Sequence, residues 1–212
     1  MFPRLRITAS QTVIETDPQA DAAAAEAFAR DLALAFTDVF APDVCAMLDR
    51  ALAQAVFIDE TGISGPRLRE APMRTALILR GLMNRPALRD WLSKITGARA
   101  LYDVRGSTAR FAAGTAQRLD WHNDVSADPR ALGFTVGLGH ERYEGGVFEI
   151  KPSRSAGVTF RFHHTRPFSF VVFPISKTIM HRVTPVTAGG PRTVYGGWFW
   201  GPNAVSSLNS VA

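Results

Sequence analysis

Two different spacings of apolar residues divide the chain, and the change from one to the other comes near residue 97. Before it, apolar side chains recur every three to four residues, which is the spacing of a helix that buries one face. The pattern predicts helices over residues 21–36, 42–56 and 86–96, the second starting at Pro42 and the third stopping at Gly97. We interpret these helices as packing elements.

From residue 98 onwards the chain consists of short runs of β-branched and aromatic residues between Gly, Pro and Asn. This pattern is typical of an antiparallel sandwich or barrel. The expected strands cover residues 100–104, 109–112, 133–138, 147–150, 158–163, 168–173, 178–183 and 194–200. Eight short strands favour a jelly roll. The predicted fold class is therefore mainly β with N-terminal helices (α+β), around a jelly-roll core.

We expect a single domain over residues 1–212, since one domain commonly has ~100 to 200 residues and no linker or repeat divides this chain. Within it, residues 1–97 would supply an N-terminal arm and bracing helices, with residues 1–18 loosely held. Residues 98–202 would form the jelly-roll core.

Charge and composition remove several classes of function. The formal net charge is +5, but the arginines are dispersed and no run of basic residues suggests a nucleic-acid surface, so such a partner is not expected. No apolar stretch approaches the ~20 residues of a membrane span, and the N-terminus shows no secretory signal. A cytoplasmic location is expected. The lone Cys45 is interpreted as a buried structural thiol.

The first candidate site residues lie in the segment Leu119-Asp-Trp-His-Asn-Asp124, which places His122 and Asp124 two residues apart. In an extended chain both side chains would point to one face. His181, on a later predicted strand, would complete a set of two histidines and one carboxylate. This set leaves metal positions open and is typical of non-haem iron(II) oxygenases, whereas a structural zinc site is closed.

Arg192 follows at the start of the last predicted strand. Its guanidinium would point into the barrel, where a planar and permanently charged group can hold a carboxylate through two parallel hydrogen bonds. The distal carboxylate of 2-oxoglutarate fits that role.

The sequence resembles the iron(II)/2-oxoglutarate-dependent dioxygenase superfamily, in its prolyl-hydroxylase-like branch, over residues 36–200. The segments that carry the resemblance are His122-Asn-Asp124, Tyr143-Glu-Gly-Gly-Val-Phe-Glu149, Val171-Val-Phe-Pro174, His181-Arg-Val-Thr-Pro-Val186, Arg192 and the opening Phe40-Ala-Pro-Asp-Val-Cys-Ala-Met-Leu48. The resemblance implies a double-stranded β-helix fold that uses Fe(II), 2-oxoglutarate and O2. It also implies hydroxylation of a small molecule, amino-acid derivative or peptide-linked residue, with release of succinate and CO2.

The chain also departs from that family pattern. Many relatives have a tyrosine before the first metal histidine that touches the co-substrate, and here that stretch contains Leu119. Thr135, Arg110 and Tyr102 are alternative co-substrate contacts by strand position. Asp124 favours hydroxylation over halogenation, because halogenating relatives have a small residue in its place.

Other readings stay open at this point. The same site can support desaturation or cyclisation, and a cupin-like barrel that binds metal or ligand without turnover is the non-catalytic alternative. Neither the substrate nor the oligomeric state follows from the sequence.

Several further residues receive weaker interpretations. His163 and His164 should face opposite sides of a strand, so only one can face inward, and His140 should face solvent. Asp120 could contact solvent or orient a metal ligand. Packing is the expected role for at least two of the tryptophans at positions 121, 198 and 200. Residues 61–74 have loop composition, and Arg67, Arg69 and Arg74 within them suggest an anionic substrate.

Overall fold

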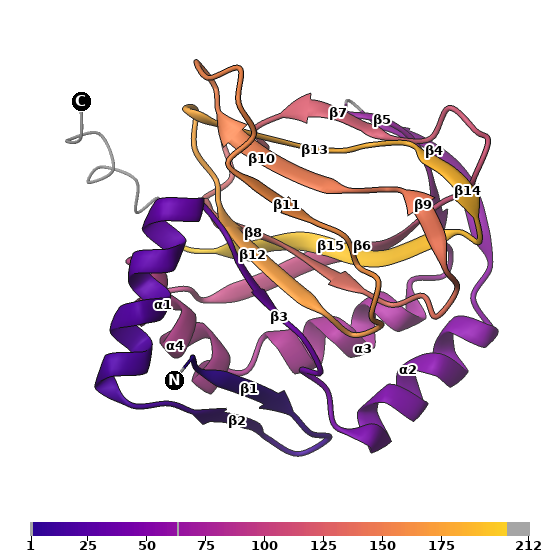
Figure 1. Cartoon of the computed structure of the whole chain (residues 1–212). Coiled ribbons are helices and arrows are strands. Elements are labelled where there is room, and N and C mark those ends of the chain that lie inside the picture. The colour runs from indigo at the N-terminus through magenta and orange to yellow at the C-terminus, as the bar shows by residue number, and fades with distance from the viewer. Residues whose placement is uncertain (1, 63, 203–212) are drawn as a thin grey trace.

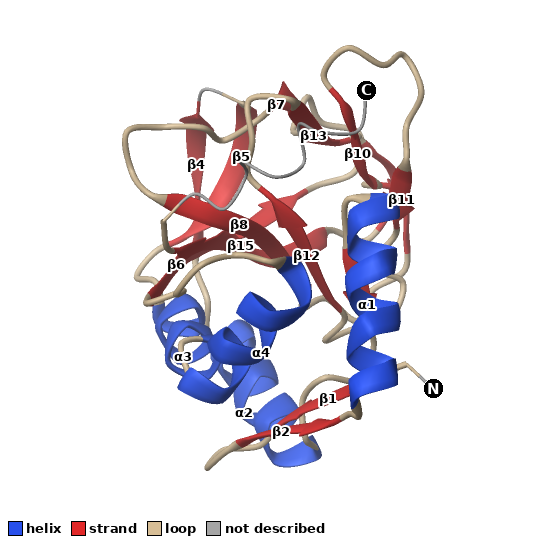
Figure 2. Cartoon of the chain, turned by 90° about the vertical axis from the view of Figure 1, so that its left-hand side faces the viewer, coloured by secondary structure: helices blue, strands red, loops and turns tan. Residues whose placement is uncertain are grey.

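Two β-sheets face each other, and helices cover the outer side of the larger sheet (Figures 1 and 2). The computed structural model describes residues 2–62 and 64–202. Residue 1, residue 63 and residues 203–212 of the expected domain therefore lie outside the described part. The paired sheets and the helices that pack on them confirm the predicted jelly-roll core with N-terminal helices.

The larger sheet has seven strands in the order β3-β12-β8-β15-β6-β5-β4. Its strands are β3 (Leu34–Phe36), β4 (Phe57–Gly62), β5 (Gly65–Glu70), β6 (Asp103–Phe111), β8 (Arg130–Gly137), β12 (Phe170–Pro174) and β15 (Arg192–Trp200). The two stretches predicted at 100–104 and 109–112 are parts of one strand, β6, which pairs with β15 along its whole length. The central strands β8 and β15 form the floor on which the site is built.

The smaller sheet has four strands in the order β11-β10-β13-β7. They are β7 (Leu119–His122), β10 (Phe148–Pro152), β11 (Phe160–Phe162) and β13 (Ile179–Val183). The segments expected as turns near residues 143–146 and 188–191 instead contribute two short strands that pair with each other, β9 (Tyr143–Gly145) and β14 (Val186–Gly189). Backbone pairing between these segments, which are far apart in the sequence, could not be read from their turn-like composition.

Four helices are described: α1 (Pro18–Asp31), α2 (Pro42–Ala53), α3 (Arg74–Met83) and α4 (Pro86–Thr96). The prediction for α4 is confirmed at both ends, with Gly97 in the left-handed conformation at φ 71°. Helix α1 is shorter than predicted, because Leu32 ends it at φ 60° and the next residues form β3. That strand pairs with β12, so sheet formation overrides the helical spacing of Phe36. Among these described helices, none has the length and apolar character needed to cross a membrane.

Two predicted irregular segments are ordered hairpins. Residues 61–74 were expected to form a loop, yet β4 and β5 pair from Phe57 with Glu70 to Gly62 with Gly65, and α3 follows. The predicted loose arm pairs as β1 (Arg4–Ile7) with β2 (Thr12–Glu15). Ile7 is fully buried against the helices. Both predictions were wrong because polar residues on the exposed face of a hairpin look like loop residues in sequence.

Side chains alternate between two faces along the core strands. On β12, Phe170 and Val172 pack against the helices, whereas Val171 and Phe173 pack between the sheets. On β13, Ile179, His181 and Val183 are buried, while the intervening residues are partly exposed. This alternation follows from the two-residue period of a strand. It decides which polar side chains reach the space between the sheets.

Asp21 connects helix α1 to helix α4. Its carboxylate accepts hydrogen bonds from Thr16 Oγ1 at 2.7 Å, Trp91 Nε1 at 2.9 Å and Lys94 Nζ at 2.6 Å. Burial acts to raise the pKa of Asp21, but these three hydrogen bonds outweigh it and lower the pKa below the usual 3.8. A carboxyl group with a lowered pKa in the folded state stabilises the protein above pH ~4, and that contribution is lost as the pH falls through the folded pKa.

We therefore expect Asp21→Asn to lower the free energy of unfolding at pH 7 by about 1–3 kcal/mol, because hydrogen bonds to a charged group are lost. The difference between the variant and the wild type should shrink below pH ~4, where the wild-type carboxylate also becomes protonated. Urea denaturation at pH 7 and pH 3 measures both quantities. Asp31→Asn is the matched control, since Asp31 lies on the same helix and pairs with Arg30 at the surface. A pH-independent deficit in Asp21→Asn would contradict this account.

Candidate metal and co-substrate site

The two histidines of the predicted triad lie opposite each other on neighbouring strands of the smaller sheet. His181 on β13 pairs directly with His122 on β7, and their rings lie 4.2 Å apart between centroids. A register shift follows, so that Val183 pairs with Leu119. Because of this irregularity, Leu119 and His122 both line the interior although three positions separate them.

Asp124 reaches the same place by a different route from the predicted one. Strand β7 ends at His122, and Asp124 follows it with φ 56°, in the left-handed region. The side chains converge through this turn and not through strand alternation, so the expected reason for their proximity was wrong. Two contacts hold Asp124: Trp198 Nε1 donates to Oδ2 at 3.0 Å, and Arg130 Nη1 donates to its backbone carbonyl at 3.1 Å.

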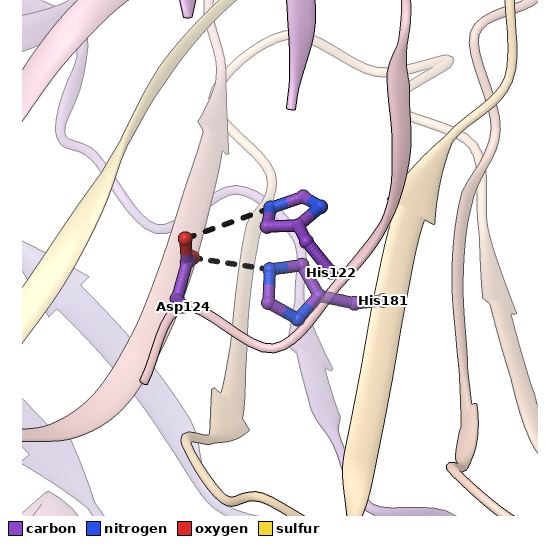
Figure 3. Close-up of side chains that lie close together, drawn as sticks. All are labelled: His122, Asp124 and His181. Carbon is purple, nitrogen blue, oxygen red and sulfur yellow. Dashed lines mark hydrogen bonds and ion pairs between the residues drawn. The ribbon is translucent and has the colours of Figure 1, made fainter. Parts of the chain in front are cut away.

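The three side chains form a compact group in which one ligand atom from each lies within 4.8 Å of the others (Figure 3). His181 Nε2 lies 3.1 Å from Asp124 Oδ2, and His122 Nε2 lies 3.6 Å from Asp124 Oδ1. His122 Nδ1 lies 2.6 Å from the carbonyl oxygen of Asp120, which can only accept, so Nδ1 carries the proton. The Nε2 lone pair of His122 is therefore free for a metal ion.

The local electrostatics keep these groups in the form that binds metal. Burial acts to raise the pKa of Asp124, but the hydrogen bond and charge of His181, with His122 and Trp198, lower it to about 2. Burial lowers the pKa of His122, and the neighbouring His181 lowers it further. At neutral pH the group thus offers a carboxylate and a neutral imidazole, which metal ligation requires. The donor set fits iron(II) with positions left open.

A cavity of about 280 Å³ lies between the two sheets and contains the triad. Arg192 is the first residue of β15, and it lines this cavity together with Val194, Gly196 and Trp198 at alternate positions of the same strand. The predicted inward direction of the Arg192 side chain is what the structure shows.

The guanidinium of Arg192 is 1% exposed, and its Nε and Nη1 atoms have no hydrogen-bond partner. Burial lowers its pKa, against the opposing effect of the nearby Tyr143. Gly146 makes room for this pair, since a Cβ there would lie 2.9 Å from both Arg192 Cδ and Tyr143 Cε2. A buried cation with two unpartnered nitrogen atoms is costly, so the arrangement fits an anionic ligand that completes it.

The other three expected co-substrate contacts divide by strand face. Thr135 lines the cavity, and its buried Oγ1 has no partner. Arg110 does not reach the cavity, because its side chain lies on the opposite face of β6 from Ala109 and Phe111, which line it. Arg110 instead donates to Thr193 Oγ1 at 3.1 Å and lies over the Phe57 ring. Tyr102 precedes β6 and is 51% exposed, away from the cavity. Strand position alone did not specify the face.

The remaining histidines lie outside the triad. His164 is buried, and its Nδ1 lies 2.7 Å from Ser169 Oγ. Burial, with the charge of Arg192, lowers its pKa well below the usual value. His163 is half-buried against the Tyr143 ring, and His140 is largely exposed beside Asp49, as predicted. The pair at 163 and 164 thus has one buried member.

Two of the weaker interpretations change in the structure. Asp120 does orient His122, but through its backbone carbonyl, while its carboxylate is exposed and bonds to Arg118 at 2.8 Å. Trp121 lies outside the cavity, between the cationic ends of Lys151 and Arg182.

Sequence reasoning missed the support that Trp198 and Arg130 give to Asp124. Arg130 also lies over the Trp198 ring, 3.9 Å from its centroid. The aromatic end of the last strand was a signal for Trp198, and nothing in the sequence singled out Arg130. Of the three arginines expected near the substrate, only Arg67 lines the cavity, whereas Arg69 bonds to Glu60 and Arg74 begins α3.

Comparison with known families identifies the core. Residues 107–200 match the model of the 2OG-Fe(II) oxygenase superfamily. The matched segment runs from β6 to the end of β15 and contains His122, Asp124, His181 and Arg192. This segment of the chain is similar to the 2OG-Fe(II) oxygenase superfamily, which includes prolyl hydroxylases. A search of curated protein sequences found no match.

Solved structures show the same fold at low sequence identity. A 2OG-Fe(II) oxygenase family oxidoreductase from Burkholderia pseudomallei matches 93% of this chain and 98% of its own, with a TM-score of 0.67 and 16% identity. A prolyl-4-hydroxylase from Pseudomonas putida matches 86% of this chain and 100% of its own, with a TM-score of 0.60 and 16% identity. The α-ketoglutarate-dependent epimerase SnoN from nogalamycin biosynthesis matches 92% and 90%, with a TM-score of 0.61 and 16% identity. Proteins with this fold thus include a prolyl-4-hydroxylase and an epimerase.

Proposed function

We propose that this chain is a hydroxylase in which His122, Asp124 and His181 bind iron(II) and Arg192 binds the distal carboxylate of 2-oxoglutarate. Its substrate would be a small molecule, an amino-acid derivative or a peptide-linked residue. The match of residues 107–200 to the 2OG-Fe(II) oxygenase superfamily implies Fe(II), 2-oxoglutarate and O2 as the reacting set. The particular roles of these residues are what we propose beyond that match.

One observation carries the proposal: the triad and the guanidinium of Arg192, whose Nε and Nη1 have no partner, line the same cavity. The guanidinium can bind one end of a dicarboxylate through parallel hydrogen bonds, and its burial strengthens them. Thr135 Oγ1, also buried without a partner in the cavity wall, is the proposed additional hydrogen-bond donor.

The residues of the chain position the reactants. When bound, iron(II) would activate dioxygen, whose reduction would take two electrons from the decarboxylation of 2-oxoglutarate to succinate and CO2 and two from the substrate that is hydroxylated. Asp120 fixes the tautomer of His122, and Trp198 and Arg130 fix Asp124. Phe148 and Phe173 pack around His181 and limit the access of water on that side. Such fixed supports raise metal affinity and hold the geometry of the open positions.

We also propose that the N-terminal elements and the jelly roll form a single domain. One continuous hydrophobic cluster supports this, because it includes Phe28 of α1, Leu48 of α2, Leu88 of α4 and Phe134 of β8. The cytoplasmic location stays a prediction.

The first experiment is anaerobic addition of iron(II) and 2-oxoglutarate to the purified protein. We expect the weak visible charge-transfer band of an iron-chelated keto acid, and we expect His181→Ala to abolish it. His140→Ala is the matched control, because His140 is largely exposed and bonds to Asp49 away from the cavity. That variant should retain the band.

Each result separates the parts of the proposal. Iron binding without a band would mean that the metal site stands and the 2-oxoglutarate assignment fails, which favours a non-catalytic barrel. A band that survives in His181→Ala would overturn the triad. Succinate release in air, measured after the band is established, then identifies substrates.

A further inference from the structure

The wall of the cavity has more positive than negative charge. Its ionisable groups, apart from the two triad histidines, are Arg67, Arg130, Arg192 and the single carboxylate of Asp124. Iron(II) and 2-oxoglutarate carry opposite charges of equal size, so loading both leaves the excess of arginine unchanged. An enclosed positive surplus favours a ligand with negative charge, since charges in a partly buried site are weakly screened.

Two of the three arginines have a role in the proposed site. Arg192 faces the space assigned to the co-substrate carboxylate. Arg130 donates to the Asp124 carbonyl and lies over the Trp198 ring, so it holds the metal ligand in place. Arg67 is the arginine of the cavity wall that neither role uses.

Arg67 is positioned on the β4–β5 hairpin with its guanidinium held in place. Its Nε lies 2.7 Å from Glu60 Oε2, and its Nη2 lies against Gly62, where a Cβ would be 3.3 Å away. Glu60 also binds Arg69 Nε at 2.6 Å, so one carboxylate serves two guanidinium groups, and this group of three side chains keeps a net positive charge.

The hairpin itself is fixed beside the metal site. The amide of Arg118 donates to the Pro66 carbonyl at 3.2 Å, and the amide of Asp120 donates to the Ser64 carbonyl at 2.8 Å. These bonds join the hairpin to the segment that ends in His122. Arg67 therefore projects from a rigid rim, where an arginine is already oriented before a ligand binds.

From this arrangement we infer that the substrate carries an acidic group, a carboxylate, which binds to Arg67 at the rim of the cavity while the group to be oxidised faces the triad. The inference rests on the proposed function of the same site. A guanidinium and a carboxylate match in planar shape and can share parallel hydrogen bonds. Partial use of Arg67 by Glu60 favours a singly charged partner over a doubly charged phosphoryl group.

The test uses calorimetry under anaerobic conditions on the full chain loaded with iron(II) and 2-oxoglutarate. The probes are N-acetylated amino acids, each matched with its neutral carboxamide and with its phosphonate analogue. We expect acids to bind about 10- to 100-fold more tightly than their amides, which is the range for a hydrogen bond between charged groups. Tighter binding of phosphonates than of carboxylates would overturn the assignment of a carboxylate.

Arg67→Gln should remove the preference for acids, and Arg69→Gln should keep it. Arg69 is a matched control because it lies on the same strand and shares Glu60 but does not line the cavity. In either variant Glu60 keeps one arginine partner, so the hairpin retains an ion pair. Equal affinity for acids and amides in the wild type, no binding of any acid, or equal loss in both variants would overturn the inference.

The charge-transfer band, recorded first, distinguishes the two levels of failure. If the band forms and acids show no preference, the proposed function stands and the acidic substrate is rejected. If the band does not form in the wild type, the proposed function itself fails.

Discussion

Asp124→Ala is expected to abolish hydroxylation and to weaken iron(II) binding by more than ~100-fold. Loss of a residue that only hydrogen-bonds to a metal ligand lowers metal affinity by ~10- to 100-fold, and loss of a ligand itself should lower it further. Asp124 supplies the only carboxylate of the group of three and accepts hydrogen bonds from both His181 and Trp198. Its removal leaves two imidazoles without a carboxylate, which hold iron weakly. Anaerobic iron(II) titration measures the loss of affinity, and succinate release measures the loss of turnover.

The conformation of Asp124 requires a second variant. With φ 56°, an alanine there is strained, whereas glycine is not. Asp124→Gly removes the carboxylate without that strain and should lose iron to the same degree. Asp120→Ala is the control, because it deletes a carboxylate four residues away but keeps the backbone carbonyl that orients His122. Retained iron affinity in Asp124→Gly, or equal loss in Asp120→Ala, would refute the assignment.

The second large effect is expected at Arg192. We expect Arg192→Met to weaken 2-oxoglutarate binding by about 100-fold or more, since two hydrogen bonds between charged groups are lost in a buried site. Iron(II) affinity should change little, because Arg192 is not one of the triad ligands. The intensity of the charge-transfer band against 2-oxoglutarate concentration measures the first quantity, and iron titration without co-substrate measures the second.

Arg192→Met should also change thermal stability, and in the opposite direction to its effect on 2-oxoglutarate binding. In the absence of ligand, the buried guanidinium of Arg192 has two nitrogen atoms without partners, so an apolar side chain of similar volume should raise Tm. The rise in Tm that 2-oxoglutarate should cause in the wild type should then be absent. Arg110→Met is the matched control on the neighbouring strand, with its side chain outside the cavity. If Arg110→Met lowers co-substrate affinity as much as Arg192→Met, the assignment of Arg192 is wrong.

Much of the molecule followed from local pattern. Helix α4 was predicted at both ends because its apolar stripe, starting proline and terminating glycine agree with one another. The strands of the core were visible as β-branched and aromatic runs. His122, Asp124 and His181 were predicted from residue type and order, and the structure brings them together. Their roles as iron ligands stay a prediction that the experiments above test.

Other features depended on partners far away in the sequence. Residues 34–36 continue a helical pattern, yet they form a strand because β12 offers its edge. The β4–β5 hairpin looked like a loop, and its place beside β7 makes Arg67 part of the cavity wall. Neither the pairing of β3 with β12 nor the hydrogen bonds between the hairpin and residues 118–120 leave a local signal, because they join distant segments.

The sequence by itself determined the class of fold, the metal-binding residue types and the single arginine that opens the last strand. Only the tertiary structure decided which face each strand turns to the cavity, which separates Thr135 and Arg192 from Arg110. It also decided that a turn at Asp124 brings the carboxylate to the histidines. The physical reason is that a shift of one residue in register or one irregularity reverses the direction of a side chain, and long-range pairing sets the register.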